Sequence, residues 1–210
     1  CREYHSRNRR LYIGRENPLN AQETPVDVTI KGQNDQTFWL GSGILVGKGS
    51  TATLQVNTAV NDTLAKLGQG TLIINAKGNG LGDINVGDGT VILNQQADAL
   101  GAKRAFDQVN IVSGRGTVIL SNAEQLGADG ERLDNVHFGF RGGRLDVNGN
   151  SLTGEQIRHD DDGAMLVNHN ANTAATITLT GRPQINADGF GSVTTDNGNI
   201  SVSYTHLTLP

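Results

Sequence analysis

The sequence predicts an all-β chain that folds as a right-handed parallel β-helix, a solenoid with loop insertions. One phrase occurs three times, as GQGTLII at 68–74, GDGTVIL at 87–93 and GRGTVIL at 114–120. Each copy places a Gly-x-Gly turn before a run of β-branched and aliphatic residues, which is typical of a turn that leads into a strand. Six such runs have equivalent positions at 54, 72, 91, 118, 145 and 177. The spacing widens along the chain, which predicts stacked coils with longer insertions between some of them.

The direction of the side chains follows from the run GGRLDVNG at 142–149. Its charged residues Arg144 and Asp146 are expected to face water, so Leu145 and Val147 face inward. The same phase in the other five runs puts an aliphatic residue in every inward slot. The other predicted inward pairs are Leu54/Val56, Leu72/Ile74, Val91/Leu93, Val118/Leu120 and Ile177/Leu179.

Other all-β architectures fit these spacings less well. An antiparallel sandwich needs a turn every 8–12 residues, and the Leu/Asn consensus of a leucine-rich repeat is absent. Right-handed coiling is the default for parallel crossovers. Ile73, Ile92 and Ile119 form an expected outward apolar column, explained either by strand propensity under a covering loop or by a partner surface.

The composition excludes several functional classes. The chain has 28 Gly in 210 residues without a Gly-x-y repeat, so it is not collagen. The net charge is −4 with mixed signs, which leaves no basic face for nucleic acid. Cys1 is the only cysteine, so an internal disulfide is impossible; this suits a cytosolic protein and also a chain that crosses membranes unfolded. The sequence shows no signal peptide and no initiator Met, and we expect it to be a piece of a longer protein.

The residues between strands are expected to form surface loops. Residues 98–106 and 121–134 hold helix formers and charges, and Ser121 to Glu124 has the pattern of a capping box that opens a helical turn. The DDDG segment at 160–163 predicts a tight turn. Phe38 and Trp39 are interpreted as core or end-capping residues.

The residues that most resemble a chemical site have ordinary explanations. Ser42 lies between two glycines, but no Gly-x-Ser-x-Gly or Gly-Asp-Ser-Gly sequence is present. His137, His159 and His169 lack metal-ligand spacing, and the HDDD segment at 159–162 lacks the full ligand set of an EF-hand calcium loop. We therefore expect no catalytic, cofactor-binding or metal-binding residues in this chain.

Two further patterns suggest ligands on other folds. The glycines at 78, 80 and 82 resemble a nucleotide loop, but a strand-like DINV segment follows where a helix would be needed. Polysaccharide lyases use Asp clusters with Arg or Lys bases on β-helices, and this alternative would employ Asp83, Asp88, Arg115, Arg141 and Arg144.

Several longer motifs are specific to one family. The segments KLGQGTLIINAKGNGLGDINVGDGTVILNQQAD, IVSGRGTVIL, FGFRGGRLDVNG and DDGAMLVNHN closely resemble the passenger region of serine protease autotransporters of the immunoglobulin A protease type, from about Gln36 to Gly181. The resemblance implies a β-helical stalk between an N-terminal chymotrypsin-like protease domain and a C-terminal outer-membrane barrel. The catalytic residues of the family lie upstream of these motifs, so none is carried over.

We accordingly divide the chain into an irregular N-terminal segment (1–25), a parallel β-helical passenger stalk (26–200) and a non-native tail (201–210). The first hypothesis is a non-catalytic stalk whose parent is a serine endopeptidase, located outside the cell or on its surface after passage through the periplasm. The second hypothesis is an adhesin stalk that binds host or sister-cell surfaces. The partners implied are the protease domain and the barrel of the same parent chain, and a host surface protein in the second case.

Overall fold

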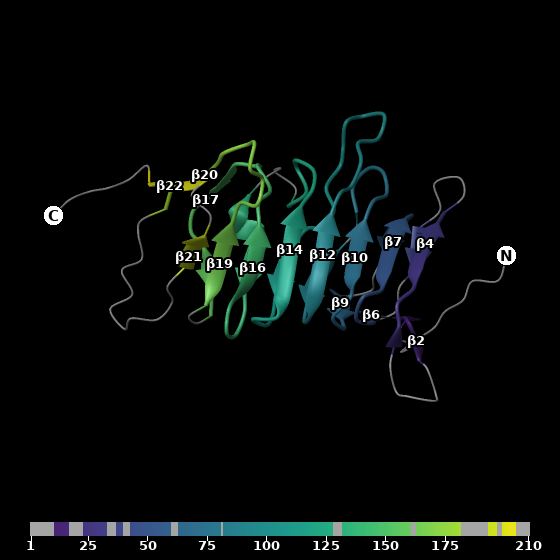
Figure 1. Ribbon diagram of the computed structural model, residues 1–210. Helices are drawn as coiled ribbons and strands as arrows, with labels where there is room; N and C mark the ends of the chain where they lie inside the picture. Colours follow the sequence, from purple (N-terminus) through teal and green to yellow (C-terminus); the bar gives the residue numbers. More distant parts are fainter. Residues whose placement is uncertain are drawn as a thin grey trace.

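The computed structural model describes residues 11–16, 23–32, 37–39, 43–59, 63–80, 82–127, 132–160, 163–181, 193–196 and 199–204. The chain winds into a rod of stacked coils (Figure 1), a parallel β-solenoid of about six turns. The predicted fold class is confirmed. Among the described residues, no helix is long and apolar enough to cross a membrane.

The larger of two long sheets has eight parallel strands in the order β21-β19-β16-β14-β12-β10-β7-β4 and faces the viewer in Figure 1. Each strand comes from a different coil, so neighbours in the sheet are distant in sequence. The strands are β4 (Asp27–Lys31), β7 (Thr51–Gln55), β10 (Thr71–Ile74), β12 (Gly89–Leu93), β14 (Gly116–Leu120), β16 (Gly143–Asp146), β19 (Ala164–Val167) and β21 (Val193–Asp196).

The second long sheet has seven parallel strands in the order β1-β6-β9-β11-β13-β15-β18. Its strands are β1 (Leu11–Ile13), β6 (Gly43–Val46), β9 (Thr63–Leu67), β11 (Asp83–Val86), β13 (Val109–Ile111), β15 (Val136–Phe138) and β18 (Arg158–His159). From β6 onward, each strand of this sheet leads into a strand of the larger sheet through a tight corner of two to four residues.

A third wall is less regular. It contains the parallel sheet β17 (Leu152–Gly154), β20 (Ala175–Leu179) and β22 (Ile200–Tyr204), and the parallel pair β5 (Thr37–Trp39) and β8 (Asn57–Ala59). Single bridges between Lys77 and Gln96 and between Phe106 and Leu126 continue this wall. One antiparallel pair, β2 (Arg15–Glu16) and β3 (Glu23–Thr24), lies beside the first coil.

The predicted inward faces are confirmed. All twelve residues assigned to the inside are at most 6% exposed, and all of them except Val56 form one continuous core with the apolar inward residues of the second sheet. The outward column is also confirmed as a ladder, since Ile92 pairs with both Ile73 and Ile119. These three side chains are half-buried on the outer face of the larger sheet.

Two of the predicted steps between coils are wrong. Leu54 pairs with Ile74 instead of the predicted Leu72, which pairs with Ala52. Leu145 pairs with Leu166 instead of the predicted Ile177, which belongs to the third wall. The physical reason for the first error is that side chains alternate with period 2, so a slip by one full period leaves every inward side chain inward.

The insertions also differ from the prediction. The segment from Ser121 to Glu124 has bends at residues 122–124 instead of a helical turn, and Glu124 has a φ of 59°, which ends any helix there. The side-chain oxygen of Asn122 accepts a hydrogen bond from the Ala123 N–H at 2.9 Å, which favours a local turn. Phe106 and Leu126 are at most 1% exposed. The loops therefore contribute to the core as well as to the surface.

Some of the predictions concern residues or side chains that the structure does not describe. Ser42, Asp161 and Asp162 lie outside them, as do the side chains of Phe38 and Trp39. β1, β2 and β3 lie within the segment assigned as irregular, and β22 crosses the boundary at residue 200. The domain division remains a proposal.

Candidate functional site: the polar turns that join the coils

The described part of the chain has no metal-binding group of three or more His, Cys, Asp and Glu side chains. His137 Nε2 lies 2.8 Å from Asp160 Oδ1 at the surface. His159 pairs in register with Phe138, whose side chain is buried, so His159 faces the inner side of the sheet while His137 faces outward. The histidines thus have separate environments.

Two of the residues of the lyase alternative lie together. Asp88 and Arg115 form an ion pair of 3.3 Å between successive tight corners. Arg141 stacks over the exposed ring of Phe140 at 5.9 Å, and an Arg144 guanidinium nitrogen lies 3.8 Å from Met165 Sδ. The glycines at 78, 80 and 82 lead into strand β11, as the sequence predicts, and no helix follows them.

A glutamine pair forms the first set of buried polar contacts, at the corner that follows β12. Gln125 is 1% exposed; its Oε1 accepts the backbone N–H of Gln95 at 2.7 Å, and its Nε2 donates to the carbonyl of Lys103 at 2.9 Å. Gln95 in turn accepts from the Ala76 N–H and donates to Asn57 Oδ1. These side chains therefore form hydrogen bonds with backbone groups of successive coils. Without them, those backbone groups would be buried at the corner and unpaired.

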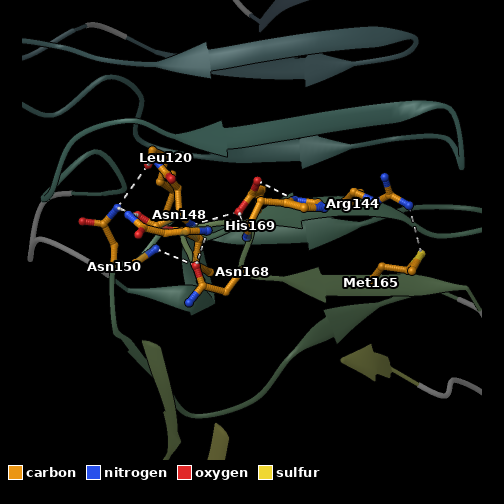
Figure 2. A network of polar contacts seen from close by, with 11 residues as sticks. Leu120, Arg144, Asn148, Asn150, Met165, Asn168 and His169 are labelled. Atoms are coloured by element: carbon orange, nitrogen blue, oxygen red, sulfur yellow. Dashed lines mark hydrogen bonds and ion pairs between the residues drawn. The ribbon is translucent and has the colours of Figure 1, made fainter. Parts of the chain in front are cut away.

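An asparagine cluster does the same closer to the C-terminal end of the rod (Figure 2). Asn148 and Asn150 both donate to the carbonyl of Leu120 in the preceding coil, at 3.1 Å each. Asn168 accepts the Gly149 N–H at 2.9 Å and donates to the carbonyl of Asn199 at 2.9 Å. The cluster therefore connects the coils of β14, β16 and β19 with the start of β22.

Asp146 belongs to this cluster, and the prediction that it faces water is wrong. Its side chain is 7% exposed. Oδ1 accepts the backbone N–H groups of Asn148 and His169, and Oδ2 lies 2.8 Å from His169 Nδ1. A carboxylate with three such contacts can be buried, because most of the lone pairs that lose water gain a partner. The contact between Asp146 and His169 holds the corner after β19 against β16.

Lys66 is a second buried charged residue, and it is not among the predicted inward residues. It occupies an inward position of β9, between the fully buried Ile44 and Val86 of the neighbouring strands. Its Nζ donates to the carbonyl of Gly68 at 2.7 Å and to that of Asp88 at 2.8 Å. Burial lowers the pKa of Lys66 to about 8, and the charge of Asp88 offsets part of this effect.

Sequence patterns contain weak signals for these contacts. In the run TLAKL, Lys66 stands two residues after Leu64. Strand alternation therefore predicts that its side chain faces inward, whereas its charge alone predicts that it faces outward. Asn75 and Asn94 follow the equivalent strands β10 and β12 and are joined by a hydrogen bond of 3.3 Å, so an Asn directly after both strands is a usable signal. Gln95 and Gln125 had no such signal, because they lie in loops of unequal length.

The polar contacts thus join coils, and the comparisons with known proteins agree with that architecture. No family model matches the chain. It is 52% identical over 159 residues to an immunoglobulin A1 protease autotransporter of Haemophilus influenzae, which covers 76% of this chain and 9% of the relative. It is 48% identical over 158 residues to an adhesion and penetration protein autotransporter of that species, covering 75% of this chain and 11% of the relative.

A solved structure shows the same fold. The crystal structure of the Haemophilus influenzae Hap adhesin matches with a TM-score of 0.71 and 41% identity, over 86% of this chain and 21% of that one. The chain spans about a tenth of the length of the curated relatives it matches. These relatives are secreted autotransporters, displayed at the cell surface or released. The chain therefore belongs to the passenger β-helix region of the serine protease autotransporters of the immunoglobulin A protease type.

Proposed function

We propose that this chain is a non-catalytic stalk segment of a secreted autotransporter whose parent is a chymotrypsin-like serine endopeptidase. The observation that carries the proposal is the uninterrupted stacking of coils, in which apolar columns and polar corners bind each coil to the next. Such a solenoid gains its stability from nearest neighbours and can extend one coil at a time. It is suited to hold another domain at a distance.

The partners of the stalk are parts of the same parent chain. The relatives are autotransporters, which implies an N-terminal protease domain and a C-terminal translocator in the outer membrane. In this arrangement the stalk displays the protease away from the cell, and its folding outside the outer membrane supports secretion of the chain. The catalytic residues belong to the protease domain.

A second function has its own support. Two of the similar proteins carry adhesion in their names, the adhesion and penetration protein and the Hap adhesin. In an adhesin the outward column of Ile73, Ile92 and Ile119 would contact a host or sister-cell surface. Replacing these three residues with Ser would then abolish cell binding but leave secretion intact. In a stalk that only displays a protease, the same replacement would change neither cell binding nor secretion.

The stalk function is tested in the full-length parent expressed on cells. Leu93→Asp with Leu120→Asp places two carboxylates in the fully buried columns of β12 and β14. Since an unpaired buried charge costs several kcal/mol, we expect surface delivery, measured by antibody labelling of intact cells, to fall by roughly tenfold. The matched control is Thr90→Asp with Thr117→Asp on the outward face of the same strands. Equal secretion of both double variants would contradict the stalk function.

A further inference from the structure

The tight corners after β9 and β11 direct backbone carbonyl groups toward one point inside the rod. The carbonyls of Gly68 and Asp88 accept hydrogen bonds from Lys66 Nζ. A Cβ on Gly89 would lie 2.5 Å from the carbonyl oxygens of both Gly68 and Gly70, and 2.8 Å from Lys66 Nζ. Gly89 has a φ of 68° as well. The corner therefore requires a glycine at this position, because the oxygen atoms and the amine occupy the space of a side chain.

This arrangement has the chemistry of a cation site. Carbonyl oxygens are acceptors only, and an ammonium group offers three donors and no acceptor. The carboxylate of Asp88 adds negative charge nearby while it accepts the N–H of Gly89 at 2.8 Å and pairs with Arg115. The stem of Lys66 lies in the apolar column between Ile44 and Val86, so the polar partners of the amine are those at the corner.

We propose that these carbonyl groups form a site for a primary ammonium group, and that Lys66 fills it from within the chain to join its coil to the next. The amine bonds to the corner of its own coil through Gly68 and to the corner of the following coil through Asp88. The contact exists only when Lys66 lies beside Val86. A slip of β11 by one period of the alternation would keep Ile84 and Val86 inward but would move Asp88 away from the amine.

The joint also has a defined dependence on pH. The charged groups on the elements packed around Lys66 are Lys48, Asp83, Asp88 and Arg115, and Asp88 is the one whose charge acts on the ammonium. The folded pKa of Lys66, about 8, lies below the ordinary lysine value of about 10.4. Between these values the unfolded chain binds more protons, so stability rises with pH, and below pH 8 this gain is absent.

The first test compares the thermal midpoints of the wild-type chain and of Lys66→Met between pH 7.5 and 9.5. Met keeps most of the length of the stem and removes the amine. We expect the midpoint of the wild type to rise with pH relative to that of Lys66→Met, while Lys77→Met, a change at an exposed lysine, behaves as wild type. If wild type and Lys66→Met change in parallel with pH, the amine is not held as proposed.

The second test restores the group from solution. In Lys66→Ala the missing atoms are those of n-propylamine, so propylammonium chloride is expected to raise the midpoint of this variant more than that of the wild type. Tetramethylammonium has no N–H donor and should give no such difference. Equal effects of the two salts would overturn the proposal. If neither variant folds, 15N NMR of the Lys66 amine in the wild type at pH 7 decides: slow exchange of its N–H protons with water, as hydrogen bonds to buried carbonyls would give, supports the site, and exchange as fast as that of the exposed Lys77 refutes it.

Discussion

At the scale of single residues, close stacking of the coils is most demanding at the corner glycines. Gly142 has a φ of 86°, and a Cβ there would overlap the carbonyl oxygen of Gly163 in the next coil. Gly101 has almost the same φ, 84°, but a Cβ there would meet nothing within 4 Å. The two positions therefore separate the cost of a left-handed backbone from the cost of a blocked coil contact.

Alanine substitutions measure this difference. We expect Gly101→Ala to lower the free energy of unfolding by about 1 kcal/mol, the ordinary cost of a side chain in the left-handed region. Gly142→Ala should lower it by roughly 3 kcal/mol or more, because backbone atoms of the neighbouring coil must move. Urea denaturation followed by circular dichroism measures both. Similar losses for the two variants would show that the approach of Gly163 is unimportant.

Among the elements, the corner after β12 depends on Gln125. Replacing it with Leu leaves the buried N–H of Gln95 and the carbonyl of Lys103 without the partners they have in the structure. Each unsatisfied buried group costs about 1–3 kcal/mol, so we expect Gln125→Leu to lower the free energy of unfolding by roughly 3 kcal/mol.

The control for this prediction is Gln55→Leu on β7, where the glutamine is exposed. A change within about 0.5 kcal/mol is expected there. Hydrogen exchange adds a local readout, since the amide of Gln95 should lose protection in Gln125→Leu and retain it in Gln55→Leu. Full protection of Gln95 in both variants would count against the corner network.

The same elements show what the sequence can and cannot predict. Alternation identifies the inward faces, because a charged or polar residue occupies the other face of most strands. It does not identify the register, since Leu54 fits beside either Leu72 or Ile74. Phe106 joins the core from a loop with no periodicity, and Lys66 and Asp146 are buried against the usual preference of charges. Each has one partner two residues away, Gly68 or Asn148, and another from the next coil, Asp88 or His169, and the latter cannot be paired with it from the sequence.

For the whole molecule, the solenoid predicts that one coil can be removed. Thr117 pairs with Arg144 in the next coil, so deleting residues 116–142 joins Arg115 to Gly143 in the same register. We expect one cooperative transition with a denaturant m value lower by about 13%, the fraction of the chain removed. Deleting residues 71–97, a segment of equal length, joins a tight corner to a loop and should abolish cooperative unfolding. Equal behaviour of the two deletions would exclude a modular coil.

The unequal corners of the rod have an evolutionary consequence. Corners that lead into the larger sheet have two to four residues, whereas connections leading back from β10, β12 and β14 have eight to 15. Insertions and deletions are therefore tolerated along one edge of the rod and excluded from the other. Descendants of such a chain can acquire new surface, or an entire inserted domain, at the permissive edge while the opposite edge keeps the coils aligned.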